Sequence, residues 1–239
     1  MVTMAGRTAR EERVNSTREL LLSAAERLFA EHGVFAVSNR QISEAAGQGN
    51  NAAVGYHFGT KTDLVRAIVR KHTRCIDRLR EQRVADTGNS TDVRDWASCL
   101  VRPITDYLAE HGNPTWFARF GAQLMTDPVL REIMLDESLT SPSLVQAIDG
   151  LNRCLPQLPV EVFLERSDMS RQLMVHMLAE RERALAERTP TPRPSWRHAA
   201  DGLIDAIAGL WLAPVTPDPS KEENRHEDHR RRGQVLRRR

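Results

Sequence analysis

The chain has 239 residues, 40% of them hydrophobic, so it can bury the core of one large domain or two small ones. It has no run of 18 apolar residues and no signal-type apolar segment at its N-terminus, which argues against membrane insertion and secretion and predicts a cytoplasmic protein. The net charge of +2 is uneven: residues 1–83 carry +5, residues 84–220 carry −7 and residues 221–239 carry +4, so the ends suit a polyanion and the middle does not.

Sequence signatures of catalysis and of metal binding are absent. The three cysteines, Cys75, Cys99 and Cys154, are odd in number and scattered, which argues against a disulfide framework and gives no metal-ligand spacing. There is no glycine-rich phosphate loop, no motif for a serine or cysteine nucleophile, and no HExxH-like spacing of histidines. We therefore expect no enzyme, and neither a metal nor a cofactor.

The chain is expected to start with a flexible arm and a scaffold helix. Residues 1–15 are polar and lack periodicity, which predicts a disordered basic arm; it is either a plain solvated tail or a contact to phosphates or a minor groove. Ser16 followed by Glu19 is a capping-box pattern and predicts the start of a helix that ends at Gly33. The apolar face of this helix comprises Leu20, Leu21, Ala24, Ala25, Leu28 and Phe29.

A short helix, a tight turn and a second short helix are predicted next. Ser38 followed by Gln41 is another capping box, and Gly47 is the residue that can adopt left-handed geometry just past a helix end. A turn of about four residues then leads to a second short helix at about residues 50–57. This arrangement is typical of a helix-turn-helix, so we assign residues 16–60 to a DNA-binding domain.

The remainder is expected to be helical as well. Thr60 with Asp63 is a third capping box, which opens a linking helix over residues 61–84. Every later periodic segment predicts a helix, so residues 85–213 should form an all-helical domain; the helices are expected at 91–110, 115–125, 128–135, 142–154, 160–188 and 195–212. Pro103 means that the first of these is kinked or is two helices. Residues 214–239, rich in proline and charge, are predicted to be a disordered basic tail, and the fold class is all-α.

The segments ELLLSAAERLFAEHG at 19–33 and AAG…YHFGTKTDL at 45–64 resemble the DNA-binding domain of the tetracycline-repressor (TetR) family over residues 16 to about 75. Two departures fall in the second short helix: one extra residue between Gly47 and His57, and Gly55 in the usual place of a tyrosine, with Tyr56 next to the histidine. The resemblance implies a helix-turn-helix domain joined by a long helix to a domain for effector binding and dimerisation. It also implies a homodimeric repressor of double-stranded DNA that a small, mostly apolar effector releases.

The expected DNA contacts combine this resemblance with side-chain chemistry. Tyr56, His57 and the opening of the linking helix are suited to phosphates, asparagine at the start of the second short helix can pair with adenine, and alanine there can touch a thymine methyl. Two alternatives stay open, because Asn50 can instead cap the helix and Arg40 can be a solvated side chain. The candidates are Arg40, Gln41, Asn50, Asn51, Ala52, Ala53, Tyr56, His57, Thr60 and Lys61.

Effector and dimer contacts are expected in the second domain. The pocket candidates, each also explicable as simple core, are Trp96, Tyr107, Trp116, Phe117, Phe120, Met125, Met174 and Met177. The candidates for a four-helix dimer interface, which an intrachain core explains equally well from the residues alone, are Phe163, Met174, Met177, Leu203, Ile204, Ile207 and Trp211. One alternative function is a DNA-binding regulator whose second domain docks a protein partner; another is a helical interaction module with a vestigial DNA-binding domain.

Overall fold

The computed structural model describes residues 3–112 and 115–216, with side chains from residue 13 onward. Within these residues the chain forms ten helices and no strand, which confirms the all-α class, and none of these helices could cross a membrane. The helices are α1 (Thr3–His32), α2 (Asn39–Ala45), α3 (Ala53–Phe58), α4 (Lys61–Thr87), α5 (Val93–Glu110), α6 (Phe117–Met125), α7 (Pro128–Leu139), α8 (Pro142–Cys154), α9 (Val160–Ala186) and α10 (Trp196–Leu212). The predicted tail lies outside the described residues from 217 onward.

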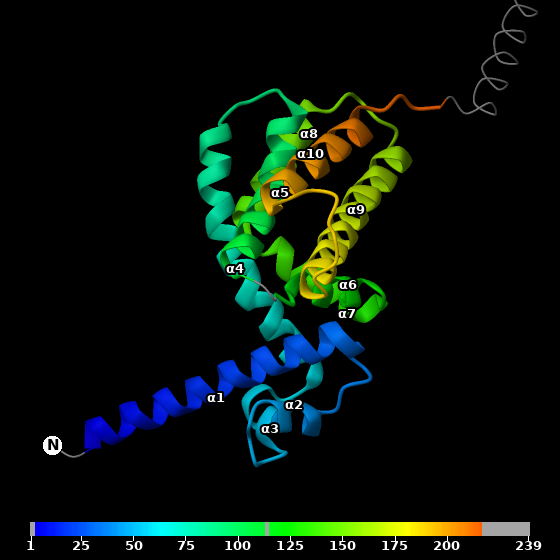
Figure 1. The fold of residues 1–239 in the computed structure, drawn as a ribbon. Coiled ribbons are helices and arrows are strands. Elements are labelled where there is room, and N and C mark those ends of the chain that lie inside the picture. Colours follow the sequence, from blue (N-terminus) through cyan, green and yellow to red (C-terminus); the bar gives the residue numbers. More distant parts are fainter. Residues whose placement is uncertain (1–2, 113–114, 217–239) are drawn as a thin grey trace, which may run out of the picture.

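Helix α1 is longer than predicted and projects from the body of the molecule as a rod (Figure 1). The prediction of a disordered arm is wrong for residues 3–15, and Ser16 lies inside the helix instead of capping it. This stretch has no proline and is rich in alanine, arginine and glutamate, which favour helix. The C-terminal half of α1 packs against the core, and the helix continues from there back through this stretch. Leu20 also differs from the prediction: it is half exposed, while Leu21, Ala25 and Phe29 are fully buried.

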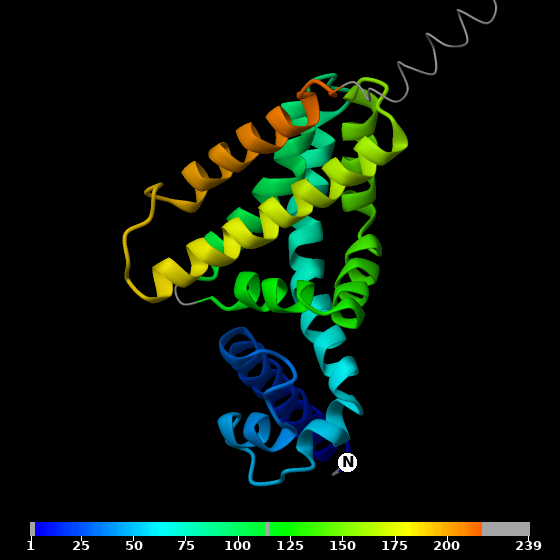
Figure 2. The ribbon, with the colours of Figure 1, turned by 90° about the vertical axis from the view of Figure 1, so that its right-hand side faces the viewer.

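The N-terminal domain consists of α1, α2 and α3 around one small core. Ile42 on α2 and Val54 on α3 are fully buried and belong to the same hydrophobic cluster as Phe29. The predicted helix-turn-helix is therefore formed: α2 packs on α1, α3 packs on the start of α4, and the two short helices contact each other. In Figure 2 this domain lies below the other helices, and α4 rises from it through the length of the molecule.

The C-terminal domain consists of α5 to α10 assembled around the upper part of α4. Helix α5 packs on α4, α8 and α10, while α9 packs on α6 and α10. Pro103 lies inside a single helix, α5, so two merged helices are excluded. Helices α9 and α10 run side by side along one side of the molecule (Figures 1 and 2).

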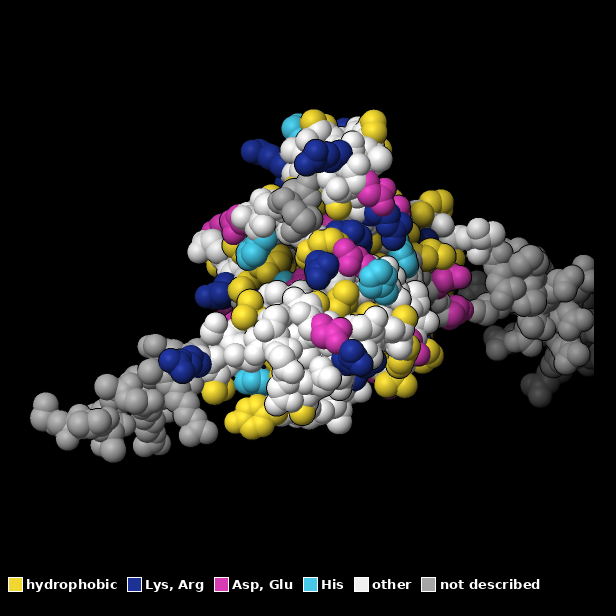
Figure 3. Space-filling view, turned by 60° about the horizontal axis from the view of Figure 1, so that its bottom comes forward, with side chains coloured by type: hydrophobic (Ala, Val, Ile, Leu, Met, Phe, Trp, Pro, Cys, Tyr) yellow, Lys and Arg dark blue, Asp and Glu magenta, His cyan; other side chains and the backbone are white. Residues whose placement is uncertain are grey.

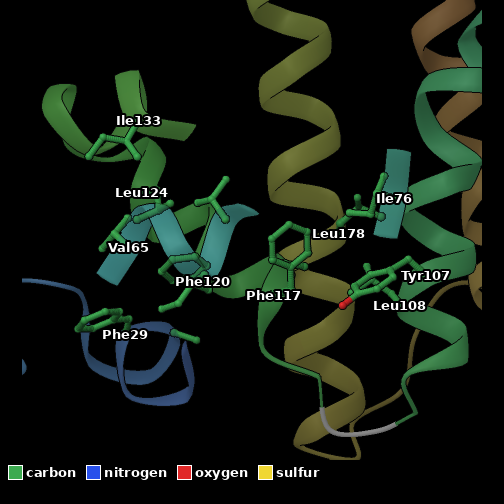
Figure 4. Close-up of a cluster of buried hydrophobic side chains, with 14 of the residues drawn as sticks. Phe29, Val65, Ile76, Tyr107, Leu108, Phe117, Phe120, Leu124, Ile133 and Leu178 are labelled. Carbon is green, nitrogen blue, oxygen red and sulfur yellow. The ribbon is translucent and has the colours of Figure 1, made fainter. Parts of the chain in front are cut away.

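The two domains share a packed junction beneath α6. Phe29 of α1 stacks on Phe120 of α6, with ring centroids 6.2 Å apart, and both side chains are fully buried. Val65 of α4 and Leu124 of α6 lie beside this pair in Figure 4. Because interiors are close-packed, a displacement of α6 is transmitted directly to the N-terminal domain.

Candidate nucleic-acid interface and internal pocket

Helix α2 begins and ends where its own sequence predicts. The Ser38 hydroxyl accepts a hydrogen bond from the Gln41 N–H (3.2 Å), and the Ser38 N–H donates to Gln41 Oε1 (2.8 Å). At the other end Gly47 has a φ of +69°, its N–H bonds to the carbonyl of Glu44 (3.0 Å), and the next N–H bonds to the carbonyl of Ser43 (2.8 Å). Both predicted signals are confirmed. The side-chain oxygen of Gln41, a candidate DNA contact, holds the helix cap instead.

The start of α3 is set by an asparagine turn. Asn50 Oδ1 accepts a hydrogen bond from the N–H of Ala52 at 2.9 Å, and the helix begins at Ala53, three residues later than predicted. Of the two alternatives for Asn50, a contact with a base or a local structural role, its side chain has the local structural role. Asn50 and Asn51 thus lie in the turn before the helix, at its exposed entrance.

Helix α3 turns one face to the core and the other to solvent. Ala53 is 8% exposed and Val54 is fully buried, so the expectation that Ala53 touches a thymine methyl is wrong. Tyr56 is 75% exposed, and its ring meets the ring of His57 edge-on at 5.1 Å. The exposed positions of this segment, which we call the α3 face, are Asn51, Ala52, Gly55 and Tyr56. They include a side chain for base edges, a small residue for close approach and a hydroxyl for phosphate.

Helix α4 begins beside this face with a capping box of its own. Thr60 Oγ1 accepts from the N–H of Asp63 (3.1 Å), and the Thr60 N–H donates to Asp63 Oδ2 (3.2 Å). The hydrogen bond from the Thr60 hydroxyl, followed by that from its N–H, holds the pKa of Asp63 below its usual value. The expected cap is confirmed, and the first turn of α4 directs its partial positive charge toward the same surface.

Lys61 has a different place from the one predicted. Its Nζ donates to the carbonyl of Val37 (2.5 Å) and to that of Val34 (3.2 Å) in the loop between α1 and α2. This ammonium group therefore ties α4 to the preceding loop, and a direct phosphate contact would have to compete with these two bonds. Sequence reasoning missed the neighbouring Thr62, which is exposed as the second residue of α4; its position just after the cap was the available signal.

The remaining predicted polar contacts lie at the edges of the α3 face. Arg40 is exposed on α2, and its Nε donates to Glu44 Oε1 at 2.7 Å. An exposed pair four residues apart on a helix contributes little stability, so Arg40 remains available to a phosphate or a guanine. His57 is half-buried and lines one end of a groove between α1 and α4.

That groove has a volume of about 710 Å³, and its lining is mostly basic. Its cationic side chains are Arg18, Arg66, Arg70, Lys71, Arg74 and Arg78. The guanidinium of Arg18 lies 4.4 Å above the Phe58 ring, and one of its nitrogens is buried without a hydrogen-bond partner among the residues that the structure describes. Figure 3, with the N-terminal domain brought forward, shows lysine and arginine side chains spread over this end among hydrophobic and acidic ones. Cationic side chains therefore line the groove along α4, next to α3.

The C-terminal domain contains a cavity of about 390 Å³ that is partly open to solvent and is lined by side chains from seven helices, α4 to α10. Three of the predicted pocket residues, Phe117, Met125 and Met174, line it. Sequence reasoning missed most of the others, such as Ile104, Ile148 and Leu144, because a single apolar residue on a buried helix face gives no sign of whether a neighbour fills the space beside it.

The other five predicted pocket residues lie elsewhere. Trp96 packs against Gly150, where an added Cβ would come within 2.2 Å of the indole, and Phe120 belongs to the junction with α1. Tyr107 donates or accepts a hydrogen bond at His72 (2.7 Å), Trp116 lies under the Arg119 guanidinium (4.3 Å), and Met177 is 52% exposed. Contacts within the core therefore explain all of these residues except Met177. A core role was the alternative that the residue pattern had left open.

The polar groups of the cavity lining are few. Arg80 is buried, donates to the carbonyl of Cys99 (3.1 Å) and to Ser141 Oγ (3.4 Å), and burial lowers its pKa to about 10. Arg171 forms an ion pair with Asp168 at 2.5 Å. The surface of the lining is mostly apolar, which suits a ligand with a large apolar body. Its other polar residues are Thr73, Ser138, Ser141, Asn152, Ser167 and Ser170.

Two buried polar clusters connect the cavity wall with α1 and α9. His72 of α4 bonds to Glu26 of α1 (2.9 Å) and to Tyr107 of α5, and its ring stacks on that of Phe117 at 4.2 Å. Burial raises the pKa of Tyr107, so its hydroxyl stays protonated in this cluster. The cluster joins the N-terminal domain to a residue that lines the cavity.

The second cluster lies at the start of α6. Glu182 of α9, 1% exposed, accepts from the N–H groups of Ala118 (3.2 Å) and Arg119 (2.8 Å) and from the Arg119 side chain (3.2 Å). Helix α6 has no side-chain cap at its own N-cap residue, Trp116, so a carboxylate from α9 takes that role.

The predicted dimer residues divide into buried and accessible ones. Leu203, Ile204, Ile207 and Trp211 are at most 6% exposed, because α10 packs this face on α5 and α9 of the same chain. Phe163 and Met174 are half-buried and line the cavity, which leaves Met177 exposed. The opposite face of α10 is open to solvent at Asp205, Ala206, Gly209 and Leu212.

Comparison with known proteins finds a family match for each domain. Residues 21–68 match the model for bacterial regulatory proteins of the tetR family, and residues 98–209 match the model for the tetracyclin repressor-like C-terminal domain; together they cover more than half of the chain. The HTH-type transcriptional repressor AcnR of Corynebacterium glutamicum is 28% identical over 128 residues, which are 52% of this chain and 60% of that protein. AcnR of Corynebacterium efficiens is 29% identical over 158 residues, or 62% of this chain and 74% of that protein.

Solved structures show the same fold. A TetR family transcription regulator from Marinobacter aquaeolei superposes with a TM-score of 0.54 at 17% identity, over 84% of this chain and 97% of that one. SmeT, the repressor of a Stenotrophomonas maltophilia multidrug efflux pump, gives a TM-score of 0.52 at 18% identity, over 85% and 98%. With a helix-turn-helix that turns α3 to solvent and with matches in both domains, the chain belongs to the TetR family of transcriptional regulators.

Proposed function

We propose that the protein is a repressor that binds a palindromic DNA operator as a homodimer and leaves it when a small, mostly apolar effector enters the internal cavity. The α3 face carries this proposal: Ala53 and Val54 anchor α3 to the core, while Asn51, Ala52 and Tyr56 remain exposed. A helix held in this way enters a major groove without losing its own packing.

The proposed division of labour at the DNA follows from the hydrogen bonds. Asn51 and Ala52 face base edges, while Tyr56, His57, Thr60 and Thr62 face phosphates, with Arg40 at the rim. Gln41, Asn50 and Lys61 act indirectly, because their side chains hold α2, α3 and α4 in place. The basic groove along α4 adds attraction that is independent of base sequence.

A homodimer is proposed because one α3 reads only a few base pairs, and a two-fold axis pairs two such helices on a palindrome. The exposed face of α10 supports close approach between two chains, since Ala206 and Gly209 are small and Met177 adds exposed apolar area on neighbouring α9. In this arrangement the buried face of α10 stays in the core of its own chain.

The cavity favours a small effector over a docked protein partner. An apolar space of about 390 Å³ remains between the helices, and its lining residue Phe117 stacks on His72, which bonds to Glu26 of α1. An effector that displaces Phe117 therefore acts on the junction with the N-terminal domain. By linkage, DNA binding lowers effector affinity by the same factor.

Capture of fragmented genomic DNA on the purified protein at near-physiological salt, followed by sequencing, tests the DNA-binding proposal. We expect a few sharp peaks over a shared palindrome, which Tyr56→Ala removes. Val129→Ala, which truncates another exposed side chain far from α3, should keep them. A flat profile that salt abolishes would mean that only non-specific electrostatic binding occurs.

Gly209→Arg tests the dimer. A Cβ at this position meets nothing within 4 Å in the chain, so the single subunit accommodates the change while a second subunit on this face does not. We expect light scattering to show a monomer and the sharp peaks to be lost. Glu132→Arg, at an exposed position of α7, should change neither the oligomeric state nor the peaks. A Gly209→Arg protein that stays dimeric would rule out this interface.

A further inference from the structure

Two hydrogen-bonding atoms in the cavity lining have no partner among the described residues: Trp211 Nε1 on α10 and Ser170 Oγ on α9. Both atoms are buried, and the Trp211 side chain belongs to a residue that is only 3% exposed. Buried polar atoms in proteins are nearly always hydrogen-bonded, so each unpaired one calls for an explanation.

The other hydroxyls of the lining show that these two atoms are exceptions. Thr73, Ser138 and Ser167 each donate to the carbonyl four residues earlier in their helices, at 3.0, 2.7 and 2.8 Å. The hydrogen atoms of these three hydroxyls are therefore already engaged and are not left for a ligand. The charged groups are also paired, since Arg171 binds Asp168 and Arg80 bonds to Cys99 and Ser141.

The indole is also held in position. Arg166 Nη1 donates to the carbonyl of Trp211 at 2.8 Å, and its other terminal nitrogen donates to the carbonyl of Ala213 at 2.7 Å. The Phe163 ring lies 5.5 Å from the indole. Because the residue is buried at 3% exposure and packed against Phe163, its N–H does not reach bulk solvent, so a partner has to come to it.

We propose that the cavity receives a neutral, largely apolar molecule with a hydrogen-bond acceptor, such as a ketone, ester or quinone oxygen, to which Trp211 Nε1–H or the Ser170 hydroxyl donates. This inference rests on the effector role of the cavity and adds its ligand class. An indole N–H donates only, which requires an acceptor. Arg80 and Arg171 already have hydrogen-bond partners, so the two unsatisfied donors are the groups of the lining that select a neutral acceptor.

Matched compounds that differ in a single group provide the test. Benzophenone and diphenylmethane have the same two rings, joined by a carbonyl in one and a methylene in the other; acetophenone with ethylbenzene and 2-undecanone with undecane supply smaller and longer pairs. Dissociation constants are measured by calorimetry on the full chain, and release of captured operator DNA is measured in parallel. The readout is the ratio of hydrocarbon to carbonyl dissociation constants within a pair.

For the wild-type protein we expect at least one pair to bind with the carbonyl member preferred, although that member is better hydrated in water. At least one of Trp211→Phe and Ser170→Ala should lower this ratio by about fivefold, the usual effect of one neutral hydrogen bond, with little change for the hydrocarbon. Ser167→Ala is the matched control, because its hydroxyl is already bonded to Phe163, and it should leave the ratio unchanged.

The outcomes separate this inference from the proposed function. If pairs bind and release DNA but the ratio is the same in all four proteins, the two donors play no part and this inference alone is overturned. Ser170→Ala keeps the test decisive even if Trp211→Phe unfolds, because truncation of a half-buried serine leaves the packing intact. If no pair binds, both this ligand class and the small-effector part of the proposed function are wrong.

Discussion

The starts of α2 and α4, in the N-terminal part of the molecule, and the start of α6, in the C-terminal domain, differ in the origin of their helix caps. In α2 and α4 the partner of the capping residue is three positions away: Ser38 pairs with Gln41, and Thr60 pairs with Asp63. The start of α6 is instead capped by Glu182, which lies 63 and 64 residues further along the chain, whereas α5, α7, α8 and α10 of the same domain have local caps. A local cap forms with its own helix, whereas a distant one exists only after the tertiary structure has assembled.

The largest effect that this comparison predicts is at Glu182. Glu182→Ala removes the cap of α6 and leaves the buried Arg119 guanidinium without its carboxylate, so we expect the free energy of unfolding to fall by about 3–5 kcal/mol. The measurement is unfolding in urea. Glu180→Ala is the control, since that side chain is 64% exposed and pairs only with exposed Arg183, and about 0–1 kcal/mol is expected. Equal losses in both variants would mean that the distant cap of α6 adds no more stability than an exposed ion pair.

A smaller effect is expected at Lys61, where the N-terminal domain also depends on a distant contact. Lys61→Met keeps the aliphatic stem but removes the hydrogen bonds to the carbonyls of Val34 and Val37, which should cost about 1.5 kcal/mol of stability, the lower end for bonds to a charged group. Lys71→Met, which breaks an exposed pair with Glu19, should cost less. If Lys61→Met weakened operator binding while its urea midpoint stayed unchanged, the phosphate role expected from the sequence would be right after all.

The smallest effect concerns pH at the capping box of α4. The pKa of Asp63 is lowered in the folded protein, so its contribution is present above the pKa of the unfolded chain and is lost as the pH falls through the depressed value, below about pH 4. Asp63→Asn should therefore lower the melting temperature at pH 7 and have less effect at pH 3. Asp136→Asn, on an exposed residue of α7, should show no such difference between the two pH values. A constant effect of Asp63→Asn would mean that its charge plays no part.

How far each feature could be predicted depended on the distance between the residues that form it. The starts of α2 and α4 and the end of α2 were predictable because Ser38, Thr60 and Gly47 act through neighbours within five positions. Ser16 has the same local pattern but lies inside α1, because a capping signal operates only where the preceding backbone is not helical. The same reasoning explains why Lys61 was assigned to phosphate: its partners Val34 and Val37 lie more than twenty positions earlier.

By itself, the sequence determined the helix-turn-helix, the all-helical second domain and nearly all of the helix boundaries, since hydrophobic periodicity and caps act over a few residues. Only the tertiary structure decided which apolar residues face the cavity, which face of α10 is buried and which polar atoms lack a partner. Trp211 illustrates the reason: its apolar ring suits a core, a dimer interface or a pocket equally well. The neighbours that distinguish these environments, among them Phe163 and Arg166, come from another helix, and their positions depend on how the helices pack together.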